Sequence, residues 1–373
     1  MKILVGDILK SNAQTIVNTV NCIGIMGKGI ALEFKNRFPD MFKDYVQRCQ
    51  RQEICIGLPY LYKSLFGPQI VNFPTKEHWK SLSKVNDIEK GLDYLVSHYK
   101  EWGIKSLAIP PLGCGNGQLE WKIVGPIIYK KLRYLEIPVE IYAPYGTNPR
   151  ELTFEFLERG FNVVHARNAN GVQVAMNPAW IALVEILNKI EQQPYHWPIG
   201  RTIFQKIAYV ATHEGLPTGF AYQKGSFGPF SKDLKTAEVK LINNNLLQEE
   251  RSGKMFMVKV GLSFEKIHKN YRMLFEQWRP ILDKTTDLFM RMNTKQAEIV
   301  ATVLYATEEL KKKNQIISET EVLDAVMMWK QKRRPPLDKT EVALTIRSLG
   351  ILHWIDAKPE NSLPIPEEYL ASV

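Results

Sequence analysis

Two glycine-rich segments, far apart in the chain, constrain its fold more than any other feature. Residues 17–32 read VNTVNCIGIMGKGIAL, and residues 109–117 read IPPLGCGNG. Each segment begins in an apolar run that predicts a buried strand, and each leads into a helical pattern. Glycine allows the backbone to come close to an anion, and the start of a helix offers free N–H groups with a partial positive charge. The sequence therefore predicts an α/β domain in which two such loops face each other across a diphosphate.

A lysine and an aspartate follow two other predicted strands. Lys76 comes after the apolar run at residues 69–73, and Asp7 comes after the strand predicted at residues 2–5. Because the carboxyl ends of strands line the ligand crevice of an α/β sheet, we expect both side chains there. The Asp7 carboxylate suits a hydrogen bond from an exocyclic amine such as that of adenine, and the cap of a turn is its alternative role.

Strand-like and helix-like patterns alternate through the first 145 residues. Strands are predicted at residues 2–5, 15–20, 69–73, 106–109 and 139–142. Helices are predicted at residues 28–38, 41–51, 86–102 and 120–134. Alternation of elements with these lengths predicts a three-layer α/β domain.

Beyond residue 175 the pattern changes to long amphipathic helices, predicted at residues 180–192, 200–212, 232–243, 264–283, 295–311 and 319–332. Two stretches repeat one order of features: a helix, a residue that tolerates the left-handed conformation, and a short apolar strand. The first is residues 236–249 with its stop at Asn245, and the second is residues 340–354 with its stop at Gly350. This order is typical of winged-helix units, and chance similarity among apolar helices is the alternative.

The chain is therefore predicted to have three parts: residues 1–155, a connector at residues 156–199, and a helical region at residues 200–373. Within the last part, residues 222–231 combine glycine and proline with three aromatic side chains. We expect this loop to dock onto helices or onto a partner.

Bulk properties restrict the class of protein further. The 373 residues include 49 basic and 39 acidic ones, and this net charge of +10 is compatible with nucleic-acid binding without requiring it. No apolar run approaches the ~20 residues of a membrane span, and the chain enters its first strand directly, which leaves no room for a signal peptide. We therefore expect a cytoplasmic protein without membrane contact. The four cysteines lack zinc-site spacing, so we expect reduced thiols and no metal site.

Together, these motifs resemble the macrodomain, an ADP-ribose-binding module. The likeness covers about residues 1–145 and rests on four motifs, at residues 6–8, 17–21, 26–31 and 110–115. Within macrodomains, the chain looks most like the branch of the terminal ADP-ribose glycohydrolase and the DarG antitoxins, because Thr75 and Lys76 match the pair that marks this branch. The helical region that follows makes the DarG type the better match. This resemblance implies a mixed sheet between helices, and no cofactor.

The resemblance also assigns roles to residues. It implies that Lys76 is catalytic, that Asp7 and Ile8 hold adenine, and that the two glycine loops hold the distal ribose and the phosphates. The implied loop residues are Asn21, Gly24, Ile25, Met26, Gly27, Lys28 and Gly29 in the first loop, and Gly113, Cys114, Gly115, Asn116 and Gly117 in the second. The Cys114 thiol lies where helix N–H groups would activate it, and simple packing is its alternative role.

Two aromatic residues are further candidates for contact with the substrate. Trp79 stands in the run Glu77-His78-Trp79-Lys80, where an aromatic ring beside cations suits a splayed base and backbone phosphate. A core position is the alternative for Trp79, and Lys80 is the alternative reactive amine. Tyr145, after the last predicted strand, is a candidate for the adenine face.

Proteins of the DarG type remove ADP-ribose from thymidine in single-stranded DNA and oppose the partner toxin DarT. The resemblance thus implies ADP-ribose, ADP-ribosylated single-stranded DNA and a cognate DarT toxin as partners. The Lys76 amine would attack the anomeric carbon of the distal ribose and form a Schiff base, or it would stabilise the departing base. Two alternatives remain open: a non-catalytic ADP-ribose reader with a DNA-binding region, and a hydrolase of ADP-ribosylated protein.

One departure from the family bears on this mechanism. The terminal ADP-ribose glycohydrolase has an acidic residue in the second glycine loop, where this chain has Gly117. Substrate phosphate, water or Glu77 would have to transfer the proton instead.

The resemblance further implies that the helical region binds the toxin, in part by imitating DNA. This region has an excess of basic residues, with runs at residues 311–313 and 330–334, so imitation of DNA would have to be local. A DNA-binding surface and a solvated helix face are the alternatives for the basic runs.

Overall fold

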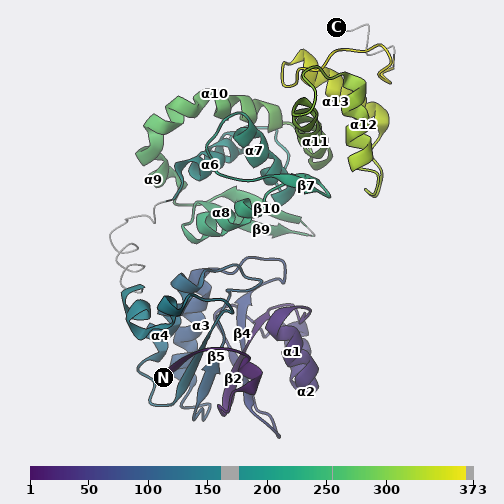
Figure 1. Cartoon of the computed structure of the whole chain (residues 1–373). Helices are drawn as coiled ribbons and strands as arrows, with labels where there is room; N and C mark the ends of the chain where they lie inside the picture. Colours follow the sequence, from purple (N-terminus) through teal and green to yellow (C-terminus); the bar gives the residue numbers. More distant parts are fainter. Residues whose placement is uncertain (161–175, 254, 367–373) are drawn as a thin grey trace. The chain divides into compact units, whose positions relative to one another are not determined.

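A computed structural model describes residues 1–160, 176–253 and 255–366 of the chain. The chain divides into two compact units, Met1–Ala175 and Met176–Val373 (Figure 1). Within the described residues, no helix combines the length and the apolar character needed to cross a membrane.

The first unit is built on one six-stranded sheet. Its strands are β1 (Lys2–Val5), β2 (Thr15–Asn21), β3 (Tyr60–Tyr62), β4 (Gln69–Lys76), β5 (Leu107–Ile109) and β6 (Val139–Ala143). Their order in the sheet is β1-β6-β5-β2-β4-β3, and every neighbouring pair is parallel except β3 and β4. The mixed sheet is therefore confirmed. The short edge strand β3 is an element that the sequence analysis did not predict.

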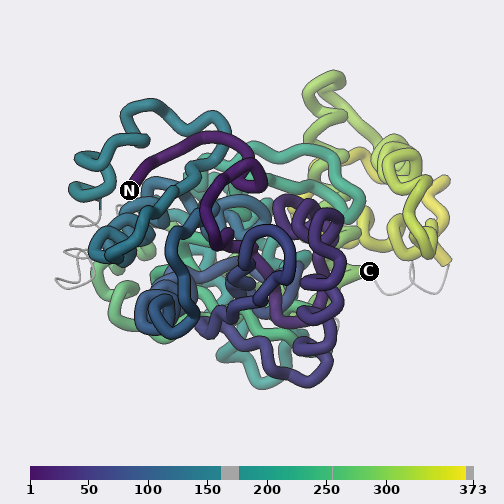
Figure 2. The backbone as a smooth tube through the Cα atoms, turned by 90° about the horizontal axis from the view of Figure 1, so that it is seen from below, coloured from purple at the N-terminus to yellow at the C-terminus, as the bar shows by residue number. Residues whose placement is uncertain are grey.

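Helices cover both faces of this sheet. They are α1 (Gly29–Arg37), α2 (Pro39–Gln50), α3 (Val85–His98) and α4 (Trp121–Leu132). On one face, Phe34 of α1 and Tyr45 of α2 share a buried cluster with Ile16 of β2. On the other face, α3 approaches β4 so closely that a Cβ atom on Gly91 would lie 2.3 Å from the ring of Phe73. The three-layer architecture is thus confirmed, and Figure 2 follows the same chain path from a second direction.

The parallel strands bring the predicted site residues to one edge of the sheet. Since β1, β2, β4, β5 and β6 all run in the same direction, the segments that follow them emerge along the same edge. Those segments contain Asp7, the loop at residues 22–28, Lys76, the loop at residues 110–120 and Tyr145. This edge is where a ligand of the first unit is expected.

The second unit is mainly helical. Its helices are α6 (Pro178–Glu191), α7 (Arg201–His213), α8 (Lys232–Asn243), α9 (Phe264–His268), α10 (Arg272–Phe289), α11 (Thr294–Lys311), α12 (Glu319–Trp329) and α13 (Lys339–Ile351). Two short hairpins join them, β7 (Gln223–Gly225) with β8 (Gly228–Phe230) and β9 (Leu247–Ser252) with β10 (Met255–Val260). Helix α6 packs against α7 and α10 in this unit, although its residues fall in the segment predicted as a connector.

The two predicted repeats of helix, stop and strand differ in outcome. In the first, α8 is followed by Asn245 with a φ of 53° and then by the β9–β10 hairpin, as expected. In the second, the strand expected at residues 351–354 is wrong. Helix α13 continues to Ile351, and the left-handed residue is His353 with a φ of 55° rather than Gly350. The helix predicted at residues 264–283 is also interrupted, by a 3-10 turn at Lys269–Tyr271.

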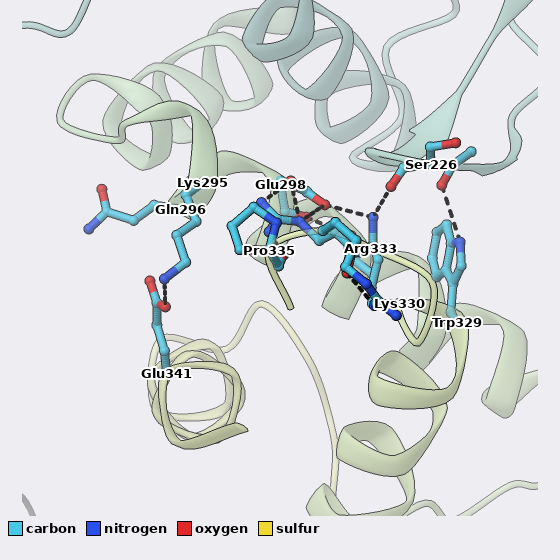
Figure 3. A network of polar contacts seen from close by, with 12 residues as sticks. Ser226, Lys295, Gln296, Glu298, Trp329, Lys330, Arg333, Pro335 and Glu341 are labelled. Atoms are coloured by element: carbon cyan, nitrogen blue, oxygen red, sulfur yellow. Dashed lines mark hydrogen bonds and ion pairs between the residues drawn. The ribbon is translucent and has the colours of Figure 1, made fainter. Parts of the chain in front are cut away.

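The glycine- and aromatic-rich loop at residues 222–231 docks onto helices of its own unit. It forms the β7–β8 hairpin, whose backbone carbonyl groups accept hydrogen bonds from side chains of other elements (Figure 3). Lys330 Nζ donates to the Ser226 carbonyl at 2.9 Å, and Trp329 Nε1 donates to the Gly225 carbonyl at 3.2 Å. Phe227, at the turn of the hairpin, stays 59% exposed.

Candidate active site

The first glycine loop is shaped by the side chain of Asn21, the last residue of β2. Asn21 Oδ1 accepts hydrogen bonds from the backbone N–H groups of Ile23 at 3.0 Å and Ile25 at 3.4 Å, and Nδ2 donates to the Ile25 carbonyl at 2.6 Å. Tyr45 of α2 adds a hydrogen bond from its hydroxyl to the Asn21 carbonyl at 2.8 Å. The amide of Asn21 therefore fixes the path of the loop.

The first glycine loop ends at the start of helix α1. Gly24 and Gly29 have φ values of 82° and 58°, a left-handed conformation that favours glycine. Lys28 is the N-cap residue of α1 and makes no side-chain capping hydrogen bond. The first N–H groups of α1 are thus left for an anion. Met26 is only 2% exposed, so its side chain belongs to the core.

The second glycine loop is a compact turn between β5 and α4. Leu119 N–H donates to the Gly113 carbonyl at 3.0 Å, and Gln118 N–H donates to the Gly115 carbonyl at 3.0 Å. In the part of the chain that the structure describes, the N–H groups of Gly115, Asn116 and Gly117 donate to no backbone carbonyl. Three successive N–H groups of this kind suit a phosphate.

Lys76 connects the two loops at the edge of the sheet. It is the last residue of β4, where it pairs with Asn21 of β2. Its Nζ donates a hydrogen bond to the carbonyl of Asn116 in the second loop at 2.9 Å. A Cβ atom on Gly29 of the first loop would in turn lie 3.2 Å from Nδ2 of Asn116. The structure thus brings the predicted catalytic lysine and both predicted loops together.

Position 117 has no room for a side chain. A Cβ atom there would lie 2.2 Å from Oγ of Ser83 and 2.5 Å from the carbonyl oxygen of Gly113. Contacts this short do not occur for real Cβ atoms, so the surroundings themselves require glycine. An acidic residue at this position of the loop is therefore excluded by geometry as well as by sequence.

Burial disfavours the thiolate form of Cys114. Its burial raises its pKa to about 12, and its Sγ contacts the carbonyl of Leu112 at 3.7 Å. The Cys22 thiol at the end of β2 also has a pKa raised to about 12, first by burial and then by the neighbouring Cys49. The raised pKa values favour the protonated form of both thiols at neutral pH, and for Cys114 this favours packing over an activated thiol.

The residues expected at the adenine end lie at the same edge of the sheet. Asp7 Oδ1 accepts a hydrogen bond from the Leu9 N–H at 3.0 Å and caps a short 3-10 helix, which is the capping role considered above. Ile8 is 4% exposed and part of the core. Tyr145 follows β6 and is 77% exposed.

The segment after Lys76 presents an aromatic ring to solvent. Trp79 is 42% exposed, so the core position considered for it is wrong. Its ring stacks on His78 with 5.6 Å between the ring centroids, and Lys80 Nζ lies 4.8 Å from the centroid of the Trp79 ring. The segment thus presents the Trp79 ring and the positive charge of Lys80 within four residues of Lys76.

Two residues of the site were not predicted from the sequence. Tyr45 supports the first loop from α2, and Ser83 lies beneath the second loop. Both are distant in sequence from the loops that they contact, and neither belongs to a motif. The single available signal was the apolar face of α2, which places Tyr45 towards the sheet without indicating its hydroxyl contact.

The chain is similar to several known proteins. The Macro domain family model matches residues 17–128. A DNA ADP-ribosyl transferase–DNA ADP-ribosyl glycohydrolase fusion protein of Thermosipho africanus is 43% identical over 162 residues, which are 39% of this chain and 42% of that protein. A DNA ADP-ribosyl glycohydrolase of Mycobacterium tuberculosis is 34% identical over 243 residues, which are 62% of this chain and 64% of that protein.

Among solved structures, the macrodomain of Mycobacterium tuberculosis DarG is 44% identical, with a TM-score of 0.37 and coverage of 38% of this chain and 97% of that chain. The matches to the two curated relatives span less than two thirds of the length of each. Lys76 and both glycine loops lie within the residues that the family model matches. The first unit of this chain therefore has the macrodomain fold and matches the Macro domain family over residues 17–128, and the chain is similar in sequence to DNA ADP-ribosyl glycohydrolases.

Proposed function

We propose that this chain hydrolyses the N-glycosidic bond that joins ADP-ribose to thymidine in single-stranded DNA. The observation that carries the proposal is the position of Lys76. Its Nζ lies 2.9 Å from the Asn116 carbonyl in the second glycine loop. On the neighbouring strand it pairs with Asn21, the residue that shapes the first glycine loop. The activity for which the relatives are named, DNA ADP-ribosyl glycohydrolase, supports the same substrate class.

The proposed binding mode follows from the hydrogen-bond donors at the edge of the sheet. The N–H groups of Gly115, Asn116 and Gly117 and the first turn of α1 would hold the diphosphate from two sides. The distal ribose would then lie beside Lys76. An amine at this place would attack the anomeric carbon while the bond to thymine breaks, and the departing base would take up a proton. Water would hydrolyse the Schiff base that follows ring opening, which releases ADP-ribose and regenerates the amine.

A second route uses the same residues without a covalent bond. The Lys76 ammonium would stabilise the departing base while water attacks the anomeric carbon. Position 117 does not admit a carboxylate. In both routes the proton therefore moves through Glu77, a substrate phosphate or water. Borohydride added during turnover separates the routes, because it reduces a Schiff base to a stable adduct on Lys76 and leaves the non-covalent route untouched.

Lys76→Ala is the central test. We expect the variant to bind ADP-ribose as the natural protein does and to lose at least about 100-fold in the rate of its release from an ADP-ribosylated thymidine oligonucleotide, the lower end of what a positioned proton-transfer or nucleophilic group contributes. Lys80→Ala is the matched control, since it removes the rival amine four residues away, and it should keep its rate. Retained turnover in Lys76→Ala would refute the assignment of Lys76.

The same assay separates the alternative functions. Release of ADP-ribose from DNA alone supports the proposal, whereas release from ADP-ribosylated protein alone indicates a protein hydrolase. Binding of ADP-ribose without release from either substrate indicates a reader.

We also propose that the second unit binds a cognate DarT toxin and that the whole chain acts as its antitoxin in the cytoplasm. The macrodomain, joined to a separate and mainly helical unit, supports this proposal. Co-purification of the chain with its toxin, and loss of that complex when the second unit is deleted, is the expected result. A complex that survives the deletion would place toxin binding elsewhere.

A further inference from the structure

Ser83 has a buried hydroxyl group without a hydrogen-bond partner. The residue is 0% exposed, and within the described residues its Oγ forms no hydrogen bond. A buried hydroxyl in this condition is costly, and native proteins retain few of them without a functional reason. None of the roles assigned above to the site uses this group.

The hydroxyl lies directly beneath the second glycine loop. Ser83 N–H donates to the Gly117 carbonyl at 3.2 Å, so the backbone of Ser83 already holds the loop. Its Oγ lies 2.2 Å from the point that a Cβ atom on Gly117 would occupy, and the carbonyl oxygen of Gly113 lies 2.5 Å from that same point. A good acceptor therefore lies near the unpaired hydroxyl, although the two do not form a hydrogen bond in this conformation.

Residues 76–83 form hydrogen bonds with two adjacent residues of the second glycine loop. Lys76, at the start of this segment, donates from Nζ to the Asn116 carbonyl, and Ser83, at its end, donates from its backbone to the Gly117 carbonyl. Any movement of the loop relative to Ser83 therefore also changes the surroundings of the Lys76 amine.

The loop has the backbone freedom for a small movement. Gly113 has a φ of 72° and Gln118 has a φ of 64°, so both residues that flank the turn are in the left-handed region. Gln118 lacks the tolerance of glycine for this conformation, so the turn holds backbone strain at this residue. An anion bound to the N–H groups of Gly115, Asn116 and Gly117 would act on this turn directly.

We propose that Ser83 is a positioning residue whose hydroxyl donates to the Gly113 carbonyl only when the second glycine loop closes on the diphosphate of bound ADP-ribose. This inference rests on the proposed function, because it takes ADP-ribose as the ligand of the site. The hydrogen bond that the free protein lacks is gained on binding, so it contributes to affinity and to the placement of Lys76, and it contributes nothing to the stability of the free protein.

Ser83→Ala gives this proposal a distinctive signature. Since the free protein loses no hydrogen bond, its melting temperature should stay the same or rise. The affinity for ADP-ribose, measured by titration calorimetry on the full chain, should fall about 2- to 12-fold, the effect of one net hydrogen bond. The increase in melting temperature on addition of ADP-ribose should shrink accordingly.

Thr285→Val is the matched control. Thr285 is also 0% exposed with an unpartnered hydroxyl, but it lies in α10 of the second unit. Loss of its hydroxyl should leave the melting temperature unchanged or higher and the affinity for ADP-ribose unchanged.

The outcomes separate this proposal from the one on which it rests. A Ser83→Ala variant that melts earlier, or that binds ADP-ribose as tightly as the natural chain, overturns the role of Ser83. A natural chain that does not bind ADP-ribose at all overturns the proposed function itself.

Discussion

At the scale of single residues, the motifs identified which positions meet at the site more reliably than what each side chain does there. Asn21 was expected to contact the distal ribose, yet its amide already makes three hydrogen bonds with the backbone of its own loop. Gly117 was recognised as a departure from the family, and its physical cause, the close approach of Ser83, lies 34 positions earlier in the chain. Such causes arise from tertiary contacts, which a motif does not contain.

Trp79 is predicted to stack against the modified base. Its ring is exposed and stands three residues after Lys76, beyond the end of β4. Stacking of a base on an aromatic ring contributes ~1–3 kcal/mol, so Trp79→Ala should lower kcat/KM on an ADP-ribosylated oligonucleotide about 5- to 150-fold. The affinity for free ADP-ribose, which has no thymine, should not change.

Phe66→Ala is the matched control for Trp79. Phe66 is 89% exposed in the same unit, but it precedes β4 and therefore lies towards the end of that strand opposite Lys76. Its substitution should leave turnover unchanged. Equal turnover by Trp79→Ala and Phe66→Ala would remove the stacking role.

At the scale of elements, the first unit was predicted well because its signals are local and repeated. Apolar runs of strand length alternate with amphipathic helices, and the bounds of β1 match the prediction fully. The edge strand β3 was missed because three residues without an alternating pattern carry almost no signal. The false strand at residues 351–354 followed from treating Gly350 as a helix stop, whereas α13 continues to Ile351 and Leu349, beside that glycine, is buried. Tertiary contacts decide such ends.

Glu298 of α11 forms a buried ion cluster with the segment that follows α12 (Figure 3). Its carboxylate accepts from Lys330 Nζ at 2.8 Å and from Arg333 Nε at 3.0 Å, and both Glu298 and Lys330 are almost fully buried. Removal of one partner leaves an uncompensated buried charge, so Glu298→Ala should lower the free energy of unfolding by ~3–5 kcal/mol. Urea denaturation of the full chain measures this loss.

An exposed ion pair nearby provides the control for Glu298. Lys295 and Glu341 also form an ion pair, on α11 and α13, but both side chains remain partly exposed (Figure 3). Glu341→Ala should cost at most about 1 kcal/mol, because water screens the pair. Similar losses in the two variants would contradict the distinction between buried and exposed pairs drawn here.

Glu238 of α8 is predicted to make the stability of the second unit depend on pH. Burial, followed by the charge of Glu249, raises the pKa of the Glu238 carboxyl from its usual 4.5 to about 8. The folded state therefore holds a proton that the unfolded state releases between about pH 4.5 and 8, so the contribution to stability is complete below this window and is lost as the pH rises through it.

Glu238→Gln should remove this dependence. Chemical denaturation at several pH values should show a flatter profile between pH 5 and 8 for Glu238→Gln than for the natural chain. Glu250→Gln, at a half-exposed position on β9, should leave the profile as it is. An unaltered slope in Glu238→Gln would mean that the carboxyl is ionised in the folded state.

At the scale of the whole molecule, the two units have separate cores and separate assigned roles. Buried residues of the sheet and its helices, such as Ile16 and Phe34, form the core of the first unit, and Phe204 and Phe289 are buried in the second. Every residue proposed to contact ADP-ribose or DNA lies at or before Tyr145, within the first unit. The chemistry and the proposed capture of the toxin are thus assigned to different parts of the chain.

This division predicts that the chemistry survives without the second unit. A fragment of residues 1–175 contains the whole sheet, its four covering helices and both glycine loops, so it should fold and release ADP-ribose from the oligonucleotide. Its kcat/KM should stay within about twofold of that of the full chain, because contributions from independent sites add to within a few tenths of a kcal/mol. A fragment of residues 176–373 should release no ADP-ribose, since it lacks Lys76. Circular dichroism establishes first that each fragment is folded; a folded but inactive 1–175 fragment would then show that the second unit contributes to catalysis.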